Sequence, residues 1–166
     1  MTFEEIVSKA PQEIKDMLED LKQMRERPDY HPEPSAYIHV KIVTERLLKT
    51  GDMDLVLAGL FHDIGKFATM KINPKTGHPT SPGHELVGAD LVRKYSDFVT
   101  SMGANPENVY EIVKNHMRIK QMGQMRRHKQ EEIKNLKNFG KLSIFTIADN
   151  MLNDFDVEFE KLRNNS

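Results

Sequence analysis

The chain has 166 residues, of which 38% are hydrophobic and 30% charged, and its formal net charge is −1. This length suits one globular domain, and the balanced charge gives no overall field that would attract nucleic acid or a membrane surface. There are no cysteines, which excludes disulfides and thiolate ligands, so any metal must be held by His, Asp or Glu.

Apolar residues recur at helical spacing along almost the whole chain, and alternating strand-like runs are missing, which predicts an all-α fold. Residues 2–26 indicate one or two polar helices, with a break or a first turn at Pro11. Residues 27–34 contain three prolines and are expected to be extended, because the residue before a proline is pushed out of the α region.

Further helices are expected from about 35 to 48, from about 52 to 66, from Ser81-Pro82, from Asn105-Pro106, and from about 142 to 155. A loop is expected at residues 73–79, and residues 121–137 form a polar, basic stretch. We expect a single domain over residues 1–166, with its core at about 28–155 and an N-terminal helical segment at 1–27.

The pair His62-Asp63 closes an apolar helical run that begins at Leu55. Burying an imidazole and a carboxylate side by side is unfavourable unless a partner compensates them, and one metal ion would compensate both. Four more residues on other apolar helix faces share this character: His39, His84, His116 and Asp149. The sequence therefore predicts a metal site assembled from separate helices.

Histidine and aspartate ligands favour Mn, Fe, Co, Ni, Zn or Mg as the ion. Six ligands exceed what one tetrahedral zinc needs. Two arrangements stay open: two ions bridged by Asp63, or one ion with His84 and His116 held for substrate. Either arrangement leaves water on the metal, which lowers the pKa of that water into the physiological range and predicts a hydrolase.

The order of these residues, with His39 first, then His62-Asp63, then Asp149, resembles the HD superfamily of metal-dependent phosphohydrolases. His84 and His116 are similar to the extra histidines of its two-metal members. Residues 30–33 (Tyr-His-Pro-Glu), 61–66 and 83–89 look like the HD domain of bacterial tRNA CCA-adding enzymes, and this resemblance covers about residues 28 to 152.

The resemblance implies an all-α, single compact multi-helix HD-type domain that needs one or two divalent ions. It implies hydrolysis of a phosphate on a nucleotide or an RNA end, as a phosphatase, 2′-nucleotidase or 2′,3′-cyclic phosphodiesterase. It does not imply CCA addition, because the regions that carry out that reaction have no counterpart in these residues.

Asp63 and Lys66 are predicted to be catalytic. Lys66 lies one turn after His62, where its ammonium would neutralise a phosphoryl oxygen; the alternative is a solvated lysine beyond a helix end. His31 either lines the entrance or braces the proline-rich turn. The basic run after His116 would bind phosphate or an RNA backbone, or would form an exposed loop; its predicted contact residues are Arg118, Lys120, Arg126 and Arg127.

Two other functions stay open at this point: a (deoxy)nucleotide or alarmone phosphohydrolase, and a non-catalytic nucleotide-binding module. The binding module is disfavoured because degenerate HD modules lose ligands, whereas this chain keeps all six. No run of about 18 apolar residues is present, and the acidic start at residues 1–5 does not read as a secretory leader. We therefore expect a cytoplasmic protein without membrane partners.

Overall fold

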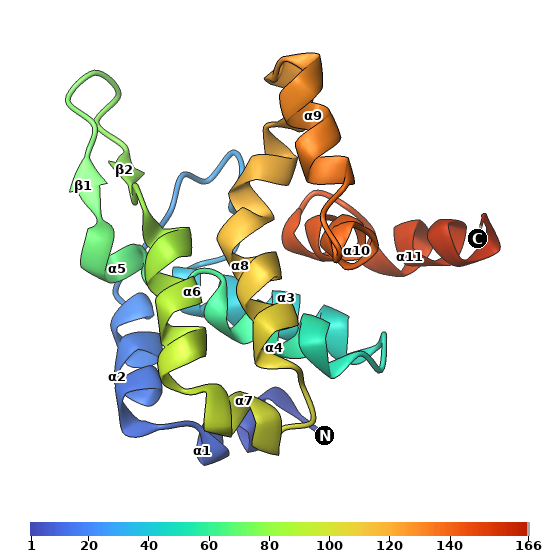
Figure 1. The fold of residues 1–166 in the computed structure, drawn as a ribbon. Coiled ribbons are helices and arrows are strands. Elements are labelled where there is room, and N and C mark those ends of the chain that lie inside the picture. Colours follow the sequence, from blue (N-terminus) through green and yellow to red (C-terminus); the bar gives the residue numbers. More distant parts are fainter. Residues whose placement is uncertain (166) are drawn as a thin grey trace.

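Helices account for nearly all of the regular structure in residues 1–165, the part of the chain that the structure, a computed structural model, describes (Figure 1). In chain order the elements are α1 Phe3–Lys9, α2 Gln12–Leu21, α3 Ala36–Leu48, α4 Met53–Phe61, α5 Lys66–Thr69, β1 Lys71–Ile72, β2 Pro79–Thr80, α6 His84–Lys94, α7 Ser96–Ser101, α8 Pro106–Lys120, the 3₁₀ helix η1 Met122–Gln124, α9 Arg127–Lys134, α10 Phe139–Asp149 and α11 Phe155–Asn164. The all-α prediction is confirmed, apart from the small antiparallel hairpin β1–β2.

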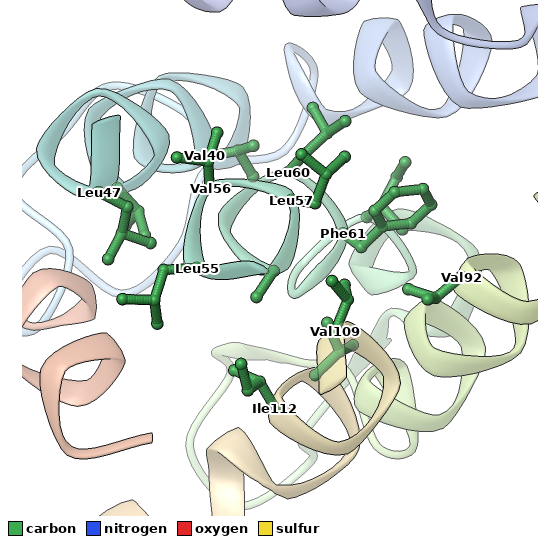
Figure 2. Packing of buried hydrophobic residues seen from close by; sticks show 14 of the residues in the cluster. Val40, Leu47, Leu55, Val56, Leu57, Leu60, Phe61, Val92, Val109 and Ile112 are labelled. Carbon is green, nitrogen blue, oxygen red and sulfur yellow. The ribbon is translucent and has the colours of Figure 1, made fainter. Parts of the chain in front are cut away.

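Helix α4 lies at the centre of the hydrophobic core. Its residues 54–61 are all buried, so the helix is covered around its whole circumference. Figure 2 shows its side chains spreading outward, with Val56 toward Val40 of α3 and the opposite face toward Val109 and Ile112 of α8. Full burial of a large aliphatic side chain stabilises the fold by ~1.5–3 kcal/mol. The packing around α4 therefore fixes the positions of the surrounding helices.

Two helices begin where capping chemistry predicts. The Ser35 hydroxyl accepts the Ile38 N–H (3.2 Å) at the start of α3. The Asn105 side chain accepts the N–H groups of Glu107 (3.0 Å) and Asn108 (3.1 Å) at the start of α8, with a proline in the first turn. These side chains satisfy backbone donors that have no partner inside the helix, which is why the boundaries could be predicted.

The expectation of one helix from 52 to 66 is wrong, because α4 ends at Phe61 and residues 62–65 form tight turns. The His62 ring donates from Nδ1 to the Gly59 carbonyl (2.7 Å), and the N–H groups of Ile64 and Lys66 bond three residues back rather than four. Such bonds tighten the chain out of the α-helical ladder. The turn lets two neighbouring side chains, His62 and Asp63, reach the same point.

The helix expected from Ser81-Pro82 begins only at His84, after Gly83 adopts a φ of +79°. Glycine takes this left-handed conformation without a Cβ penalty. His84 consequently lies at the first position of α6, and its backbone N–H bonds back to the Ser81 carbonyl (3.3 Å).

The helix expected over residues 142–155 corresponds to α10, which ends already at Asp149, and a separate helix, α11, begins at Phe155. Helix α10 ends at Asp149, where Arg46 of α3 donates to the carbonyls of Ala148 and Asn150 (both 3.1 Å). A half-buried arginine that satisfies terminal carbonyls stabilises a helix end. The last residue of α10 is therefore held against α3.

Residues 27–34 do not form the expected extended segment. The N–H groups of Tyr30 (3.2 Å) and His31 (2.9 Å) both bond to the Arg27 carbonyl, which makes a turn. The predicted break at Pro11 is confirmed, because Pro11 separates α1 from α2. Within residues 1–165, no helix is long and apolar enough to cross a membrane.

The carboxylate of Asp54 joins the start of α4 to α8 and α10. It accepts from the Asn105 N–H (2.7 Å) and Asn108 Nδ2 (3.0 Å), and it pairs with Lys141 Nζ (2.6 Å). Burial by itself raises the pKa of Asp54, but Lys141 and the two asparagine donors outweigh burial and lower it overall. The charged carboxylate of Asp54 therefore links three helices, α4, α8 and α10.

Asp54→Ala is expected to lower the free energy of unfolding near neutral pH by about 2 to 4 kcal/mol, because three donors lose their acceptor. The folded pKa lies below the unfolded value of about 4, so the carboxylate stabilises the fold above roughly pH 4 and this contribution is lost in more acidic solution. Urea unfolding at several pH values measures the difference in the free energy of unfolding between the parent and Asp54→Ala, and this difference should become smaller in acid. The exposed Asp90 of α6 gives the control Asp90→Ala; a similar loss there would contradict the assignment.

Candidate metal centre

The six metal ligands predicted from the sequence converge beyond the carboxyl end of α4, and all six are buried. They come from five parts of the chain: His39 from α3, His62 and Asp63 from the turn after α4, His84 from the start of α6, His116 from α8, and Asp149 from the end of α10. Side chains separated by up to 110 residues thus meet in one cluster.

Two glycines allow α6 to approach this turn closely. A Cβ at Gly65 would lie 2.8 Å from the Val87 side chain and 2.9 Å from the His84 carbonyl. A Cβ at Gly88 would collide with the Phe61 carbonyl at the end of α4. These distances are shorter than carbon and oxygen atoms tolerate, so both positions need glycine to hold α6 against the cluster.

One group of ligand atoms gathers around Asp149 and one oxygen of Asp63. His39 Nε2 lies 2.8 Å from Asp149 Oδ1 and 3.4 Å from Asp63 Oδ2. His62 Nε2 lies 3.2 Å from each of the same two oxygens. These four side chains offer ligand atoms that all lie within 4.8 Å of one another.

A second group gathers around the other oxygen of Asp63. His84 Nε2 lies 3.3 Å from Asp63 Oδ1, and His116 Nε2 lies 3.7 Å from it. The two Nε2 atoms are 3.3 Å apart. Asp63 therefore belongs to both groups and presents a different oxygen to each.

Each of the four histidines has its Nδ1 atom engaged outside the cluster. Nδ1 faces the carbonyl of Gly59 for His62 (2.7 Å), of Ser81 for His84 (2.8 Å) and of Val113 for His116 (2.6 Å). For His39, Nδ1 lies 2.8 Å from the Glu33 carboxylate. An acceptor beside Nδ1 orients the ring so that Nε2 is directed into the cluster, as in metal-ligating histidines, and a bound metal ion would take the place of a proton on Nε2.

A divalent cation fits this arrangement. Burial lowers the pKa of His116 and outweighs the nearby Asp63 carboxylate, so this ring is neutral and its Nε2 carries a lone pair. That lone pair points at His84 Nε2 only 3.3 Å away, and both Nδ1 protons are committed to carbonyls. Two facing lone pairs repel unless a positive charge lies between them. Imidazole and carboxylate donors without thiolate suit Mn, Fe, Co, Ni or Zn.

The ionised carboxylates of the cluster also favour the binding of a cation. Burial opposes ionisation of Asp149, but Lys120, His62 and His39 hold the pKa of its carboxyl well below the usual range. Burial likewise opposes the charge on His39, yet Asp149 and Glu33 raise the pKa of this imidazole to about 10. Buried carboxylates that stay ionised need compensating cations.

Glu33 is a site residue that the sequence reasoning missed. Its Oε1 atom lies 2.8 Å from Nδ1 of His39 and 2.8 Å from Nδ1 of His31, and the side chain is buried. Burial alone would raise its pKa, but the two histidines lower it to about 2, so the carboxylate is charged. A carboxylate behind a ligating histidine fixes its tautomer and raises its basicity.

Glu33→Ala is expected to weaken binding of Mn²⁺ by about 10- to 100-fold, the usual effect of removing such a partner. Glu33→Gln keeps an amide oxygen that accepts from Nδ1, so it should recover part of the affinity. Competition with a metal-binding dye measures both variants. Parental affinity in Glu33→Ala would show that Glu33 does not position His39.

The structure places Lys66 and Lys120 against the cluster. Lys66 is buried, pairs with Glu26 and lies 3.1 Å from Asp63 Oδ2, so it is not a solvated lysine. Burial alone would lower its pKa, but Asp63 and Glu26 raise it, and the ammonium stays charged. Lys120 Nζ pairs with Asp149 Oδ2. Each of the two aspartates thus has one lysine beside it.

The other predicted substrate-binding residues lie at different distances from the centre. His31 bonds to Glu33 and faces Glu26 (3.3 Å), so it braces the cluster and also lines a cavity. Arg118 donates to the Asn115 side chain (3.1 Å) and lines another cavity. Arg126 and Arg127 are exposed at the start of α9 and are not among the residues that line these two cavities.

Two cavities reach the cluster from different sides. One, of about 420 Å³, includes Lys66, His84 and Arg118 in its lining. The other, of about 520 Å³, includes His31, Lys120 and Asp149. Both volumes fall within the range of small-molecule sites, roughly 300 to 1,000 Å³. Of the six cluster residues, His84 lines the first cavity and Asp149 lines the second.

The helical fold and the buried His/Asp groups define a helical domain with a candidate metal centre. Residues 29–154 match the HD domain family, and the chain belongs to that family. The buried His/Asp groups are consistent with the metal binding typical of HD domains.

Several curated proteins are similar over part of their length. The A-adding tRNA nucleotidyltransferase of Deinococcus radiodurans is 35% identical over 80 residues, which cover 47% of this chain and 18% of that protein. The multifunctional CCA protein of Neisseria meningitidis is 32% identical over 105 residues (61% and 24%), and that of Hahella chejuensis 33% over 91 residues (54% and 21%). The chain spans less than a quarter of these relatives, and the predicted resemblance to their HD domains is confirmed.

Proposed function

We propose that this chain is a metal-dependent phosphohydrolase that acts on a nucleotide or an RNA terminal phosphate, as a phosphatase, 2′-nucleotidase or 2′,3′-cyclic phosphodiesterase. One observation carries the proposal: four histidines direct Nε2 toward the oxygens of two buried aspartates, and each Nδ1 is held by an acceptor outside the cluster. This combination positions ligands for cations beside two cavities.

The residues divide into two ligand sets. His39, His62, Asp63 and Asp149 would hold one divalent ion, and Asp63, His84 and His116 would hold a second. Of the two arrangements that the sequence left open, the two-ion form is supported by Asp63, which presents Oδ2 to one set and Oδ1 to the other. When bound, such ions supply Lewis acidity for attack on a phosphate ester.

The lysines and Arg118 would handle the charge of the substrate. Lys66 lines the cavity beside His84 and carries a buried ammonium, and Arg118 lines the same cavity. Cations in a site of low dielectric stabilise charge that develops on phosphoryl oxygens during reaction. Asp63, in contact with four histidines, would be the residue that holds the reacting centre together.

The substrate class is supported by the family and by the relatives. The chain belongs to the HD domain family, and the names of the similar proteins refer to tRNA and to CCA. Arg126 and Arg127 would contact the backbone of a longer RNA substrate beyond the cavities. We further assign residues 28–155 as the HD core and residues 1–27 as its N-terminal helical segment.

A phosphate-release assay tests this function. The protein is incubated with Mn²⁺, Ni²⁺, Co²⁺ or Mg²⁺ and a panel of nucleoside monophosphates, triphosphates and 2′,3′-cyclic phosphates, and products are identified by chromatography. We expect metal-dependent release from at least one nucleotide class. Activity that survives an excess of chelator, or no activity with any substrate and metal, would refute the proposal.

A further inference from the structure

The opening and the inner end of the cavity of about 520 Å³ differ in chemical character. It lies where residues 30–31, the end of α8 and the end of α10 meet, and its lining consists of Tyr30, His31, Lys120, Thr146, Asp149, Asn150 and Leu152. Asp149 is buried, and its Oδ1 lies 2.8 Å from His39 Nε2. This side of the cavity therefore ends at the candidate metal ligands.

The outer residues of the cavity are large, apolar and exposed. Tyr30 is 60% exposed and Leu152 is 68% exposed. Apolar and aromatic side chains around a cavity are typical of the lining of small-molecule sites. The cavity therefore has charged residues at its inner end and apolar side chains at its opening.

The Tyr30 ring also has contacts outside the cavity lining. The Arg27 guanidinium lies 5.2 Å from the ring centroid, and Arg27 pairs with Asp29 (2.9 Å). The following residue, His31, bonds to the buried Glu33 (2.8 Å). Contacts that favour one ring orientation before ligand binds reduce the conformational entropy lost on binding.

Lys120 lies between the two ends of the cavity. Its ammonium pairs with Asp149 Oδ2, while its side chain stays 35% exposed. A phosphate that approaches the cluster through this cavity meets this ammonium first. The rest of the molecule then lies in the outer part, among Tyr30, Leu152 and Asn150.

We propose that this cavity binds the base of a nucleotide, with Tyr30 as the stacking surface and Leu152 on the other part of the wall. This inference rests on the proposed function, because it assumes that the phosphate lies at the His/Asp cluster. Stacking on an aromatic ring tolerates any base, since every base has a π face. Purine and pyrimidine nucleotides should therefore both use the site.

Adenosine 5′-monophosphate and ribose 5-phosphate test this assignment, because they share sugar and phosphate and differ only in the base. With Mn²⁺ supplied, Tyr30→Ala should raise KM for adenosine 5′-monophosphate by about 10-fold or more, a typical effect of losing one stacking contact. KM for ribose 5-phosphate should stay at the parental value. Tyr30→Phe keeps the ring and should keep the parental KM, and Leu152→Ala should act in the same direction as Tyr30→Ala.

A binding measurement separates this inference from the proposed function. Calorimetry with adenosine 5′-thiophosphate should show the same loss of affinity in Tyr30→Ala, even if the parent hydrolyses no phosphate ester, an outcome that would refute only the proposed function. The control is Ile72→Ala, which removes an equally exposed side chain (60%) from β1. The inference would be overturned by equal KM changes for adenosine 5′-monophosphate and ribose 5-phosphate, or by unchanged KM and affinity in Tyr30→Ala. It would also be overturned if the parent did not bind adenosine 5′-thiophosphate.

Discussion

Asp63→Asn is expected to reduce turnover of a phosphate ester by at least about 100-fold, a typical scale for losing one interaction at a reacting centre. Asp63 is the only one of the six cluster residues that belongs to both ligand groups, with His39 and His62 near Oδ2 and His84 and His116 near Oδ1. Asparagine keeps the size but removes the negative charge and replaces one oxygen with a nitrogen that bears hydrogens. Steady-state kinetics at saturating Mn²⁺ measure the effect.

The fold of this variant should persist. In chelator, its free energy of unfolding is expected to stay within about 1 to 2 kcal/mol of the parent, because Lys66 keeps Glu26 as a partner and the apolar residues of α4 are unchanged. Asp90→Asn, on the exposed side of α6, provides the matched control and should retain full turnover. Near-parental turnover in Asp63→Asn with metal still bound would mean that the chemistry takes place elsewhere.

Apolar periodicity and capping residues were sufficient to predict the helical architecture, because both act over short stretches of chain. Ser35 and Asn105 begin α3 and α8 as their side-chain chemistry predicts. The same local patterns wrongly predicted that one helix continues through His62 and that another continues past Asp149. Those ends depend on bonds that local patterns do not encode, such as the contact of Arg46 with carbonyls 102 and 104 residues away.

The six cluster residues could be named from the sequence because each interrupts an apolar helix face with an imidazole or a carboxylate. Glu33 lies in an irregular segment between two prolines, where no periodicity shows which side chains are buried. Lys120 was grouped with a basic run, although it follows His116 by four residues and so shares its helix face. That spacing was the available signal that Lys120 faces the cluster, where it pairs with Asp149.

Removal and return of metal are expected to change thermal stability by a large amount. An ion that binds only the folded chain stabilises it by about 4 kcal/mol when free metal exceeds Kd by about 1,000-fold. For a domain of this size that corresponds to a rise in Tm of roughly 8 to 16 °C. The reason lies in the cluster. When metal is absent, no positive charge separates the facing Nε2 atoms of His84 and His116, and ionised Asp63 and Asp149 are compensated only in part, by Lys66, Lys120 and neighbouring histidines. Calorimetry in chelator and in excess Mn²⁺ measures the shift.

Replacing both His84 and His116 with alanine distinguishes two ions from one. If Asp63 bridges two ions, metal analysis should show the loss of one ion per chain, and the stabilisation by Mn²⁺ should fall but not vanish, because His39, His62 and Asp149 still form a set with Asp63. His128→Ala, in exposed α9, is the control and should keep the parental metal content. An unchanged metal content in the double variant would leave one ion held by His39, His62, Asp63 and Asp149. A parent that binds no metal and shows no rise in Tm would refute the metal centre itself.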